Sequence, residues 1–197
     1  EVKATPDIAS ISVGVLTKGT TAAEAVSANS IASQKLLDAL HTSGITDKDI
    51  QTSSISVYPL YKNSPQGYDD QSTIVGYQAN NQLTATIRKV ADVGKIIDAI
   101  SLAGNFSLSG VNFSLDNDDA FQSEALAKAV SSARKKADAV AKAAGVTITG
   151  IKNINVDSFG APKIFGAAAD AAVSSTQILP GDLTVSASVN IQYLIGK

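Results

Sequence analysis

The sequence of 197 residues contains no cysteine, no methionine and a single histidine. The absence of cysteine excludes thiol catalysis, disulfide bridges and zinc sites that use cysteine ligands. No apolar run approaches the roughly 20 residues that a membrane-spanning helix needs, which disfavours a membrane-embedded body. The formal net charge of -2 provides no broad positive field, which argues against a nucleic-acid partner.

Sequence motifs of common enzyme classes are missing as well. Neither phosphate-binding glycine pattern, GxGxxG or GxxxxGKS/T, occurs, and no serine stands in a G-x-S-x-G elbow. The only histidine, His41, falls near the end of a predicted helix, where a cation interacts favourably with the helix dipole. Because it lacks a second histidine or a carboxylate cluster nearby, we interpret His41 as structural and predict neither a metal site nor a catalytic base.

The residues that are present are typical of an ordinary globular chain. Hydrophobic residues make up 44% and charged residues 17% of the sequence, enough apolar material for a sizeable core. The length fits a single domain, 1–197, or two small lobes at 7–115 and 119–197. Since the sequence begins at Glu1 and not at methionine, we expect that an N-terminal segment has been removed, with a cleaved signal peptide as the natural candidate.

Periodic patterns predict the secondary structure of the first half. Alternating apolar residues indicate strands at 7–16, 50–61, 75–87 and 106–115. Helices are predicted from Thr21 to Gly44, with Thr21 and Glu24 forming a capping box, and across 90–103. Residues 7–115 therefore have the order βαββαβ, which favours an α+β fold with helices packed on one face of an antiparallel or mixed sheet.

A short internal repeat supports two similar units in series. Lys95–Ile100 followed by Gly104 repeats Lys35–Leu40 followed by Gly44, at an offset of sixty residues. We interpret this as a structural repeat and expect both helices to end in the same way; chance similarity is the alternative, because such strings are common on helices. In the next strand the alternation changes phase at Ser109-Gly110, which predicts a β-bulge.

The stretch Asp119–Ile151 is predicted to form one long helix that runs directly into a strand. Asp119 and Gln122 resemble a capping box, and Gly145 is the residue type that ends helices through a left-handed turn. Small and apolar residues recur at helical spacing and predict a narrow seam suited to close packing: Leu126, Val130, Ala133, Ala137, Val140 and Ala144.

The C-terminal part contains two further predicted strands and a long connection. The strand at 146–156 is expected to pair with a final strand whose apolar alternation runs without interruption across 183–195. The connection at 157–177 is rich in alanine, glycine and serine but carries three large apolar side chains, Phe159, Ile164 and Phe165. We predict that these three side chains pack on a neighbouring subunit at an oligomer interface.

Three clusters have alternative interpretations. The acidic run Asp116–Asp119 could suggest calcium, but it lacks the glycine and distal glutamate of an EF-hand loop, so helix capping is favoured. The basic run Arg134–Lys136 fans out over different helix faces and predicts a solvated surface and no phosphate site. Four tyrosines could line an interface or a ligand surface, although strand aromatics flanking a hairpin are the favoured interpretation: Tyr58, Tyr61, Tyr68 and Tyr77.

Four segments in a fixed order resemble a known bacterial family. They are ATPDIASISV at 4–13, GYQA at 76–79, the helix pattern from Glu124 to Gly145, and ILPG followed by VSASV at 178–189. Together they resemble the SIMPL-domain family and span nearly the whole chain. Members are periplasmic or associated with the outer membrane; some are known as immunogenic antigens and some are linked to oxidative-stress defence.

The resemblance implies an exported protein with an α+β fold, no established catalytic activity and a tendency to self-assemble. It supplies no catalytic residue, and we predict no cofactor. The first hypothesis is a non-enzymatic periplasmic protein, associated with the outer membrane without spanning it, that forms a ring- or channel-like homo-oligomer with a protective or scaffolding role. The second is a small-molecule or peptide binding module that uses the sheet face or the Tyr58–Tyr77 hairpin. An enzyme is the weakest alternative.

Overall fold

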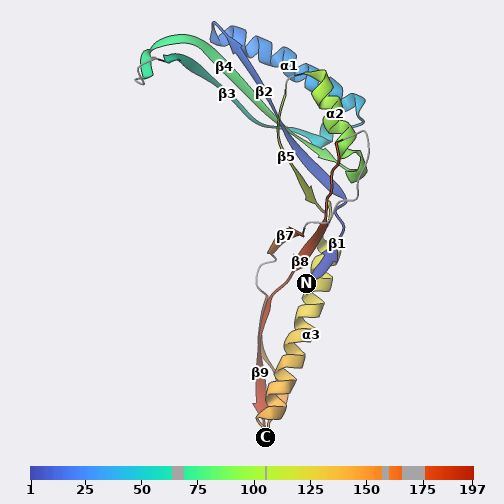
Figure 1. The fold of residues 1–197 in the computed structure, drawn as a ribbon. Helices are drawn as coiled ribbons and strands as arrows, with labels where there is room; N and C mark the ends of the chain where they lie inside the picture. Colours follow the sequence, from blue (N-terminus) through green and yellow to red (C-terminus); the bar gives the residue numbers. More distant parts are fainter. Residues whose placement is uncertain (64–68, 105, 157–159, 166–175) are drawn as a thin grey trace. The chain divides into compact units, whose positions relative to one another are not determined.

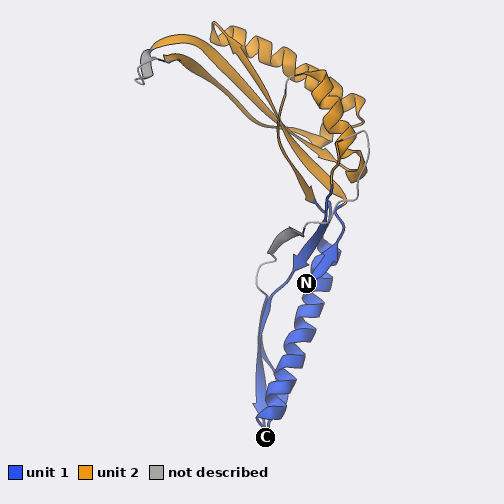
Figure 2. Ribbon diagram, in the orientation of Figure 1, with its two compact units in different colours: residues 1–6, 114–169, 179–197 blue, residues 7–113, 170–178 orange. Residues whose placement is uncertain are grey.

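The computed structural model describes residues 1–63, 69–104, 106–156, 160–165 and 176–197. The chain divides into two compact units, which Figure 2 shows in different colours. Unit 1 comprises residues 1–6, 114–169 and 179–197, and unit 2 comprises residues 7–113 and 170–178. In the part of the chain that the structure describes, no helix is long and apolar enough to cross a membrane.

Unit 2 is a four-stranded sheet with two helices on it (Figure 1). Its elements are β2 (Ile8–Gly19), α1 (Ala22–Thr42), the 3-10 turn η1 (Asp47–Asp49), β3 (Ile50–Asn63), β4 (Asp69–Ile87), the 3-10 turn η2 (Val90–Asp92), α2 (Val93–Ala103) and β5 (Ser107–Ser114). The strand order is β3-β4-β2-β5, with β4 antiparallel to both of its neighbours. This is the split βαβ order of ferredoxin-like folds, and it confirms the predicted α+β class and βαββαβ series.

The core of unit 2 lies between the sheet and the helices. Alternate residues of β2, such as Ile11 and Val13, are buried because a strand turns every second side chain to the same face. On α1 the buried positions recur at spacings of three and four and include Leu36 and Leu40. The helices face each other at a shallow recess that Ala39 and Ala99 both line, so the equivalent positions of the internal repeat meet.

Unit 1 contains the long helix and two small sheets. Its elements are β1 (Val2–Ala4), α3 (Asp119–Ala143), β6 (Thr147–Val156), β7 (Gly160–Phe165), β8 (Asp182–Ser186) and β9 (Val189–Gly196). One sheet has the order β1-β8-β7, and the other is a two-stranded ribbon of β6 and β9. Val2, Ala125 and Val185 form the centre of its small core.

The predicted final strand is in fact two strands. β8 pairs with β1 and β7, whereas β9 pairs antiparallel with β6, as predicted for the strand at 146–156. Ala187 and Ser188 separate β8 from β9 without breaking the alternation of apolar residues. An alternation pattern records which face a residue occupies but not which strand it pairs with, so the sequence could not reveal the division.

The glycines that end the helices behave differently from one another. Gly44 and Gly145 have φ of 87° and 69°, the left-handed conformation in which glycine is favoured, as predicted for Gly145. Gly104 instead has φ 168° and ψ 179°, an extended backbone. The expectation that both repeat helices end in the same way is therefore wrong. Gly110 has φ 135° at the position of the predicted bulge.

Helix α3 differs from its prediction at its start and in its buried face. Its N-cap is Asp118, which makes no side-chain capping bond, and Asn117 Oδ1 accepts the backbone N–H of Asp119 instead. The capping box at Asp119 is therefore wrong. The buried helix positions are Ala125 and Ala141, outside the predicted seam, because the neighbouring strands contact the helix along a line beside that seam.

Candidate functional site

His41 lies at the end of α1, as predicted, but it has a carboxylate partner that sequence reasoning missed. Its Nε2 is 2.8 Å from Oδ1 of Asp47, because the left-handed turn at Gly44 folds the chain back toward the helix end. The Asp47 side chain is almost fully exposed, so water screens the pair and its contribution to stability is small. This geometry offers an acid–base pair on the surface but no recess for a substrate.

The acidic run before α3 does not gather ligands. The side-chain Oδ1 of Asn117 accepts a hydrogen bond from the backbone N–H of Asp119. Among the described residues, no group of three or more histidine or carboxylate side chains could hold a metal ion. The arrangement supports local hydrogen bonding at the helix start over calcium coordination, although the side chain that accepts the bond belongs to Asn117 and not to the predicted Asp119.

The basic run on α3 is partly engaged. Arg134 Nε donates to both oxygens of Asp138, at 3.0 and 3.1 Å. The Arg134 guanidinium also lies 5.6 Å from the centroid of the Tyr193 ring, a distance at which a cation is attracted to the aromatic face. Arg134 therefore helps to attach α3 to β9, while Lys135 and Lys136 are exposed.

Among the described residues, the tyrosines around the β3–β4 hairpin line neither the polar recess of unit 2 nor the apolar groove of unit 1. Tyr58 and Tyr61 on β3 are partly exposed, and Tyr77 on β4 is half-buried. Tyr77 is the strand neighbour of Pro59. Tyr68 lies outside the described residues. These aromatics flank a hairpin, in line with the favoured interpretation.

The predicted interface residues fall in or beside β7. Phe159 lies outside the described residues, and the side chains of Ile164 and Phe165 are not described. The backbone of β7 pairs with β8, so that Ile164 is opposite Leu183 and Phe165 is opposite Asp182. The segment thus contains a strand where the sequence indicated an irregular connection, and the interface itself stays a prediction.

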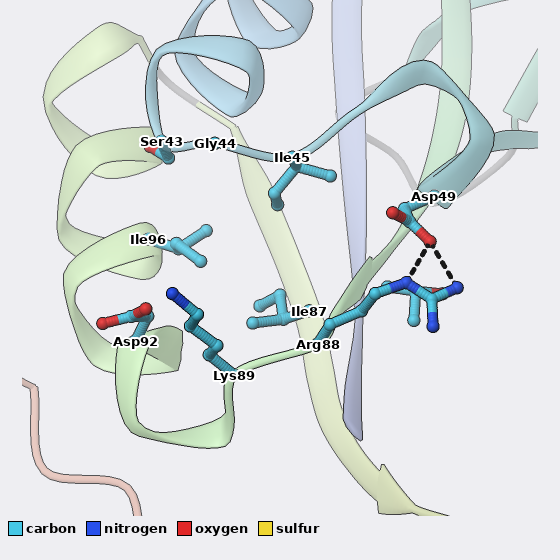
Figure 3. Close-up of a pocket in the computed structure, with 10 residues that line it drawn as sticks. Ser43, Gly44, Ile45, Asp49, Ile87, Arg88, Lys89, Asp92 and Ile96 are labelled. Carbon is cyan, nitrogen blue, oxygen red and sulfur yellow. Dashed lines mark hydrogen bonds and ion pairs between the residues drawn. The ribbon is translucent and has the colours of Figure 1, made fainter. Parts of the chain in front are cut away.

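A polar recess of about 200 Å³ lies in unit 2 where the end of α1, the end of β4 and the start of α2 meet (Figure 3). Arg88 stabilises the wall of this recess through an ion pair with Asp49. Its Nε donates a hydrogen bond to Asp49 Oδ1 at 2.9 Å, and its Nη2 lies 2.8 Å from the same oxygen. This hydrogen bond lowers the pKa of the Asp49 carboxyl below its ordinary value, and Thr46 Oγ1 contributes as a second donor.

The charges around this recess largely compensate each other. Figure 3 shows the Lys89 side chain directed toward Asp92 and Ile96, and Lys95 lies 3.8 Å from Asp92. Two carboxylates therefore accompany the basic groups, which leaves little net field for an anionic ligand. The ion pair between Arg88 and Asp49 is best explained as a tie between β4 and the η1 turn.

A buried polar network connects α1 to the sheet of unit 2. Asn29 Nδ2 donates to Val15 O at 2.8 Å and to Ala79 O at 3.2 Å, so one amide binds carbonyls on both β2 and β4. Ser33 donates to Asn29 Oδ1, and Asn81 Nδ2 donates to Ser33 Oγ. The buried Asn81 Oδ1 has no hydrogen-bond partner. The network anchors the helix but has no opening for a substrate.

Thr176 is attached to α2. Its Oγ1 donates to Asp98 Oδ1 at 2.7 Å, and its backbone N–H donates to Oδ2 at 3.4 Å. The carbonyl of Thr176 approaches Gly94 so closely that a Cβ at Gly94 would be 2.2 Å from the oxygen. Asp98 is the repeat equivalent of Asp38, whose carboxylate accepts from Gln34, so the two copies of the repeat have different partners.

An apolar groove of about 340 Å³ lies in unit 1 between α3 and the β6–β9 ribbon. It is lined by Lys136, Ala137, Val140, Ala141, Ala144, Val146, Ile148, Tyr193 and Ile195. Lys136 is the one charged residue in this lining. Such a surface can bury another apolar group, but it offers no nucleophile, paired acid and base, or metal-ligand set for catalysis.

Comparison with known proteins agrees with the predicted family. Residues 1–193 match the SIMPL family model, described as a protein of unknown function (DUF541). The 26 kDa periplasmic immunogenic protein of Brucella melitensis is 38% identical over 157 residues, which cover 77% of this chain and 61% of that protein. Its counterpart in Brucella abortus strain S19 gives the same values.

A more distant relative is the uncharacterized protein YggE of Edwardsiella ictaluri. It is 25% identical over 147 residues, which cover 75% of this chain and 60% of that protein. The match to this chain therefore spans about three fifths of the length of each of these curated relatives.

Proposed function

This chain belongs to the SIMPL family, and we propose that it is a non-enzymatic periplasmic protein that self-assembles into a homo-oligomer with a protective or scaffolding role in the cell envelope. A ring or channel would result if a head-to-tail contact closes on itself. The Brucella relatives are named as periplasmic proteins, which supports the periplasmic location. Association with the outer membrane belongs to the same proposal.

The proposal of self-assembly rests on the β3–β4 arm, the part of the β3–β4 hairpin that extends beyond β2. β2 pairs with β4 only from Tyr77 onward, so residues 69–76 of β4 pair with β3 alone. A two-stranded hairpin has little stability in water unless another surface covers it. The arm nevertheless presents apolar side chains to solvent, including Tyr61, Ile74 and Val75. Exposed strand edges with apolar side chains are surfaces on which another chain can pair or pack.

The described surface also supports a non-enzymatic role. The recess at Arg88 holds charges that already satisfy each other, His41 and Asp47 lie on an open surface, and the groove beside α3 is apolar. None of these places brings a nucleophile, a base and a polarising group to a common point.

Light scattering at several concentrations tests self-assembly. We expect the wild-type chain to form a species of defined mass above the monomer in the micromolar range. Val75→Lys on the arm should reduce its mass, because Val75 is 57% exposed and its substitution places a charge in the proposed contact. Ile31→Lys, at a 61% exposed position on α1, is the matched control and should keep the wild-type mass. A monomer at high micromolar concentration would exclude the proposal.

A periplasmic binding module is the second candidate function, and the apolar groove beside α3 favours it. Its volume of about 340 Å³ is within the range of small-molecule sites, roughly 300–1,000 Å³. A ligand that occupies the groove should raise the melting temperature of a monomer, and the increase should grow with the logarithm of the ligand concentration once this exceeds the dissociation constant. The absence of any such shift across a panel of apolar carboxylates, sterols and short peptides would count against this alternative.

A further inference from the structure

The β6–β9 ribbon has one apolar face and one polar face. Residues that lie opposite each other in an antiparallel pair share a face. On the face toward α3 the pairs are Ile148 with Ile195, Ile151 with Tyr193, Ile154 with Ile191, and Val156 with Val189. On the other face the pairs are Gly150 with Leu194, Asn153 with Gln192, and Asn155 with Asn190. The sequence thus directs the large apolar side chains of the ribbon, apart from Leu194, toward the helix layer.

Helix α3 covers only part of that apolar face. Ile151, Ile154 and Val156 on β6 remain 47 to 50% exposed, although they belong to the face that the helix packs on. On β9 the facing residues Ile191 and Tyr193 are covered better. The uncovered surface is therefore the stretch of β6 from Ile151 to Val156, together with Ile195 at the end of β9, which is 64% exposed.

The helix itself has an apolar flank that faces the same gap. Arg134 marks the flank beside β9, through its contact with the Tyr193 ring. Val140 lies roughly 120° around the helix from Arg134, lines the groove with Ile148, and is 69% exposed. The groove beside the helix flank and the exposed stretch of β6 are thus neighbouring apolar surfaces, and Ile148 of β6 lies where they adjoin.

We propose that a second copy of this chain closes this groove across a two-fold axis beside β6. The two α3 helices then pack antiparallel along their Val140 flanks, and the apolar side chains of the two β6 strands lie beneath them. Each copy covers the exposed apolar surface of the other, and the same residues form both halves of the contact, as in an isologous interface. This inference rests on the proposed self-assembly and adds a second contact surface to the β3–β4 arm.

The dimensions fit such a pair. If the two β6 strands lie side by side at the usual strand spacing of about 4.8 Å, the midlines of the ribbons are about 9.6 Å apart. That distance matches the separation of packed helices, about 8–10 Å. A contact roughly 33 Å long, the span of β6, and roughly 20 Å deep, one sheet and one helix, covers about 650 Å² per copy. The total of about 1,300 Å² reaches the size of stable interfaces.

The length of the uncovered strip favours a second copy over a small ligand. From Ile148 to Val156 the apolar residues extend over about 26 Å of strand, beyond the groove lining itself, which reaches only Ile148 on β6. The register of β6 shifts twice, between Ile148 and Gly150 and between Ile151 and Asn153. Such irregularities restrict regular pairing of the two β6 edges to short stretches, so side-chain packing and the two helices supply the rest of the contact.

Two substitutions of nearly equal exposure test the proposal. Ile151 is 49% exposed on the apolar face of the ribbon, and Leu194 is 48% exposed on its polar face. Ile151→Lys should raise the dissociation constant of the contact by at least about 100-fold in sedimentation velocity, because the charge enters an apolar interface twice in a symmetric pair. Leu194→Lys, the matched control, should leave the constant within about threefold of wild type, since surface changes outside an interface have small effects. Val140→Lys on α3 should act like Ile151→Lys. Circular dichroism confirms that each variant is folded.

The outcomes separate this proposal from the proposed function. An assembling wild-type chain whose mass responds to Leu194→Lys as strongly as to Ile151→Lys, or to neither, overturns the α3–β6 contact and leaves self-assembly intact. A wild-type chain that is monomeric overturns both. A folded monomer whose native mass includes a small apolar molecule, lost in Ile151→Lys, identifies the groove as a ligand site and also overturns the second-copy contact.

Discussion

Asn81 is the residue that interrupts the apolar series of β4, and the structure explains the interruption. Its amide donates to Ser33, which in turn donates to Asn29. Asn29 then donates to a carbonyl on each of β2 and β4. Except for Asn81 Oδ1, which has no partner, the side-chain polar groups of this network bind each other or strand carbonyls, and they fix the position of α1 on the sheet.

Asn29→Leu tests this anchor. Leucine has a similar size but cannot donate, so the carbonyls of Val15 and Ala79 lose a buried donor, and we expect the free energy of unfolding to fall by about 2–4 kcal/mol. The measurement is urea unfolding followed by circular dichroism. Gln34→Leu, at an exposed position of the same helix, should change the free energy by no more than about 0.5 kcal/mol. Equal effects of the two substitutions would contradict a structural role of the network.

The Arg88–Asp49 pair predicts a pH dependence of stability. Because the pKa of Asp49 is lower in the folded protein than in the unfolded chain, the carboxylate stabilises the fold above its ordinary pKa. This contribution disappears as the pH falls through the lowered value. Asp49→Asn should therefore be less stable than wild type at pH 7, and the difference should vanish in acid.

Unfolding by urea at several pH values between 7 and 2 measures this difference. Arg88→Gln is the matched variant, because it removes the donor that lowers the pKa of Asp49. In the double variant the two effects should not add, since both substitutions break the same interaction. A difference between wild type and Asp49→Asn that is constant over this pH range would show that the carboxylate charge has no part in it.

At the scale of elements, α3 shows why a helical pattern predicts a helix better than it predicts the buried face. The predicted seam is apolar, yet Val140 is exposed and Ala141 is buried. The apolar arc of the helix is wider than the narrow ribbon beneath it, so the position of the strands decides which part is covered. The same argument accounts for the long alternating run at 183–195, which pairs as two separate strands, β8 and β9.

The two sheets predict different local stabilities. β4 is paired on both sides, by β3 and β2, and faces the core of unit 2. β9 has only β6 as a described partner and lies over a groove. At submicromolar concentration we expect the amides of 189–196 to exchange hydrogen at least about tenfold faster than those of 79–87, because fewer contacts oppose local opening.

Hydrogen exchange followed by mass spectrometry at two concentrations provides the check. At high micromolar concentration the β6 and β9 peptides should gain protection if a second copy covers them, whereas peptides from β4 at 79–87 serve as the internal control and should not change. Equal exchange of both regions in the dilute sample would contradict the difference in local stability.

At the scale of the whole molecule, the chain combines a ferredoxin-like unit with a second unit built from both ends of the sequence. β1, at residues 2–4, pairs with β8 near the other end. Three residues are too few for a periodic pattern, so the sequence did not predict β1 or its pairing. Two cores result, one in each unit, and the apolar groove belongs to the unit with the smaller core.

The sequence by itself determined the α+β class, the βαββαβ series, the long helix ending at Gly145 and the membership of the SIMPL family. These features depend on the spacing of apolar residues along short segments, on glycine and capping residues at helix ends, and on the order of short family segments. Residues close together in the sequence determine each of them. Only the tertiary structure decided which face of α3 is buried, that the last apolar run forms two strands, that Asp47 reaches His41, and that a groove remains between α3 and β6. Most of those features arise when residues distant in the chain meet, and the contact of Asp47 with His41 depends on the turn between them. A periodic pattern records the face of a residue but not its partner.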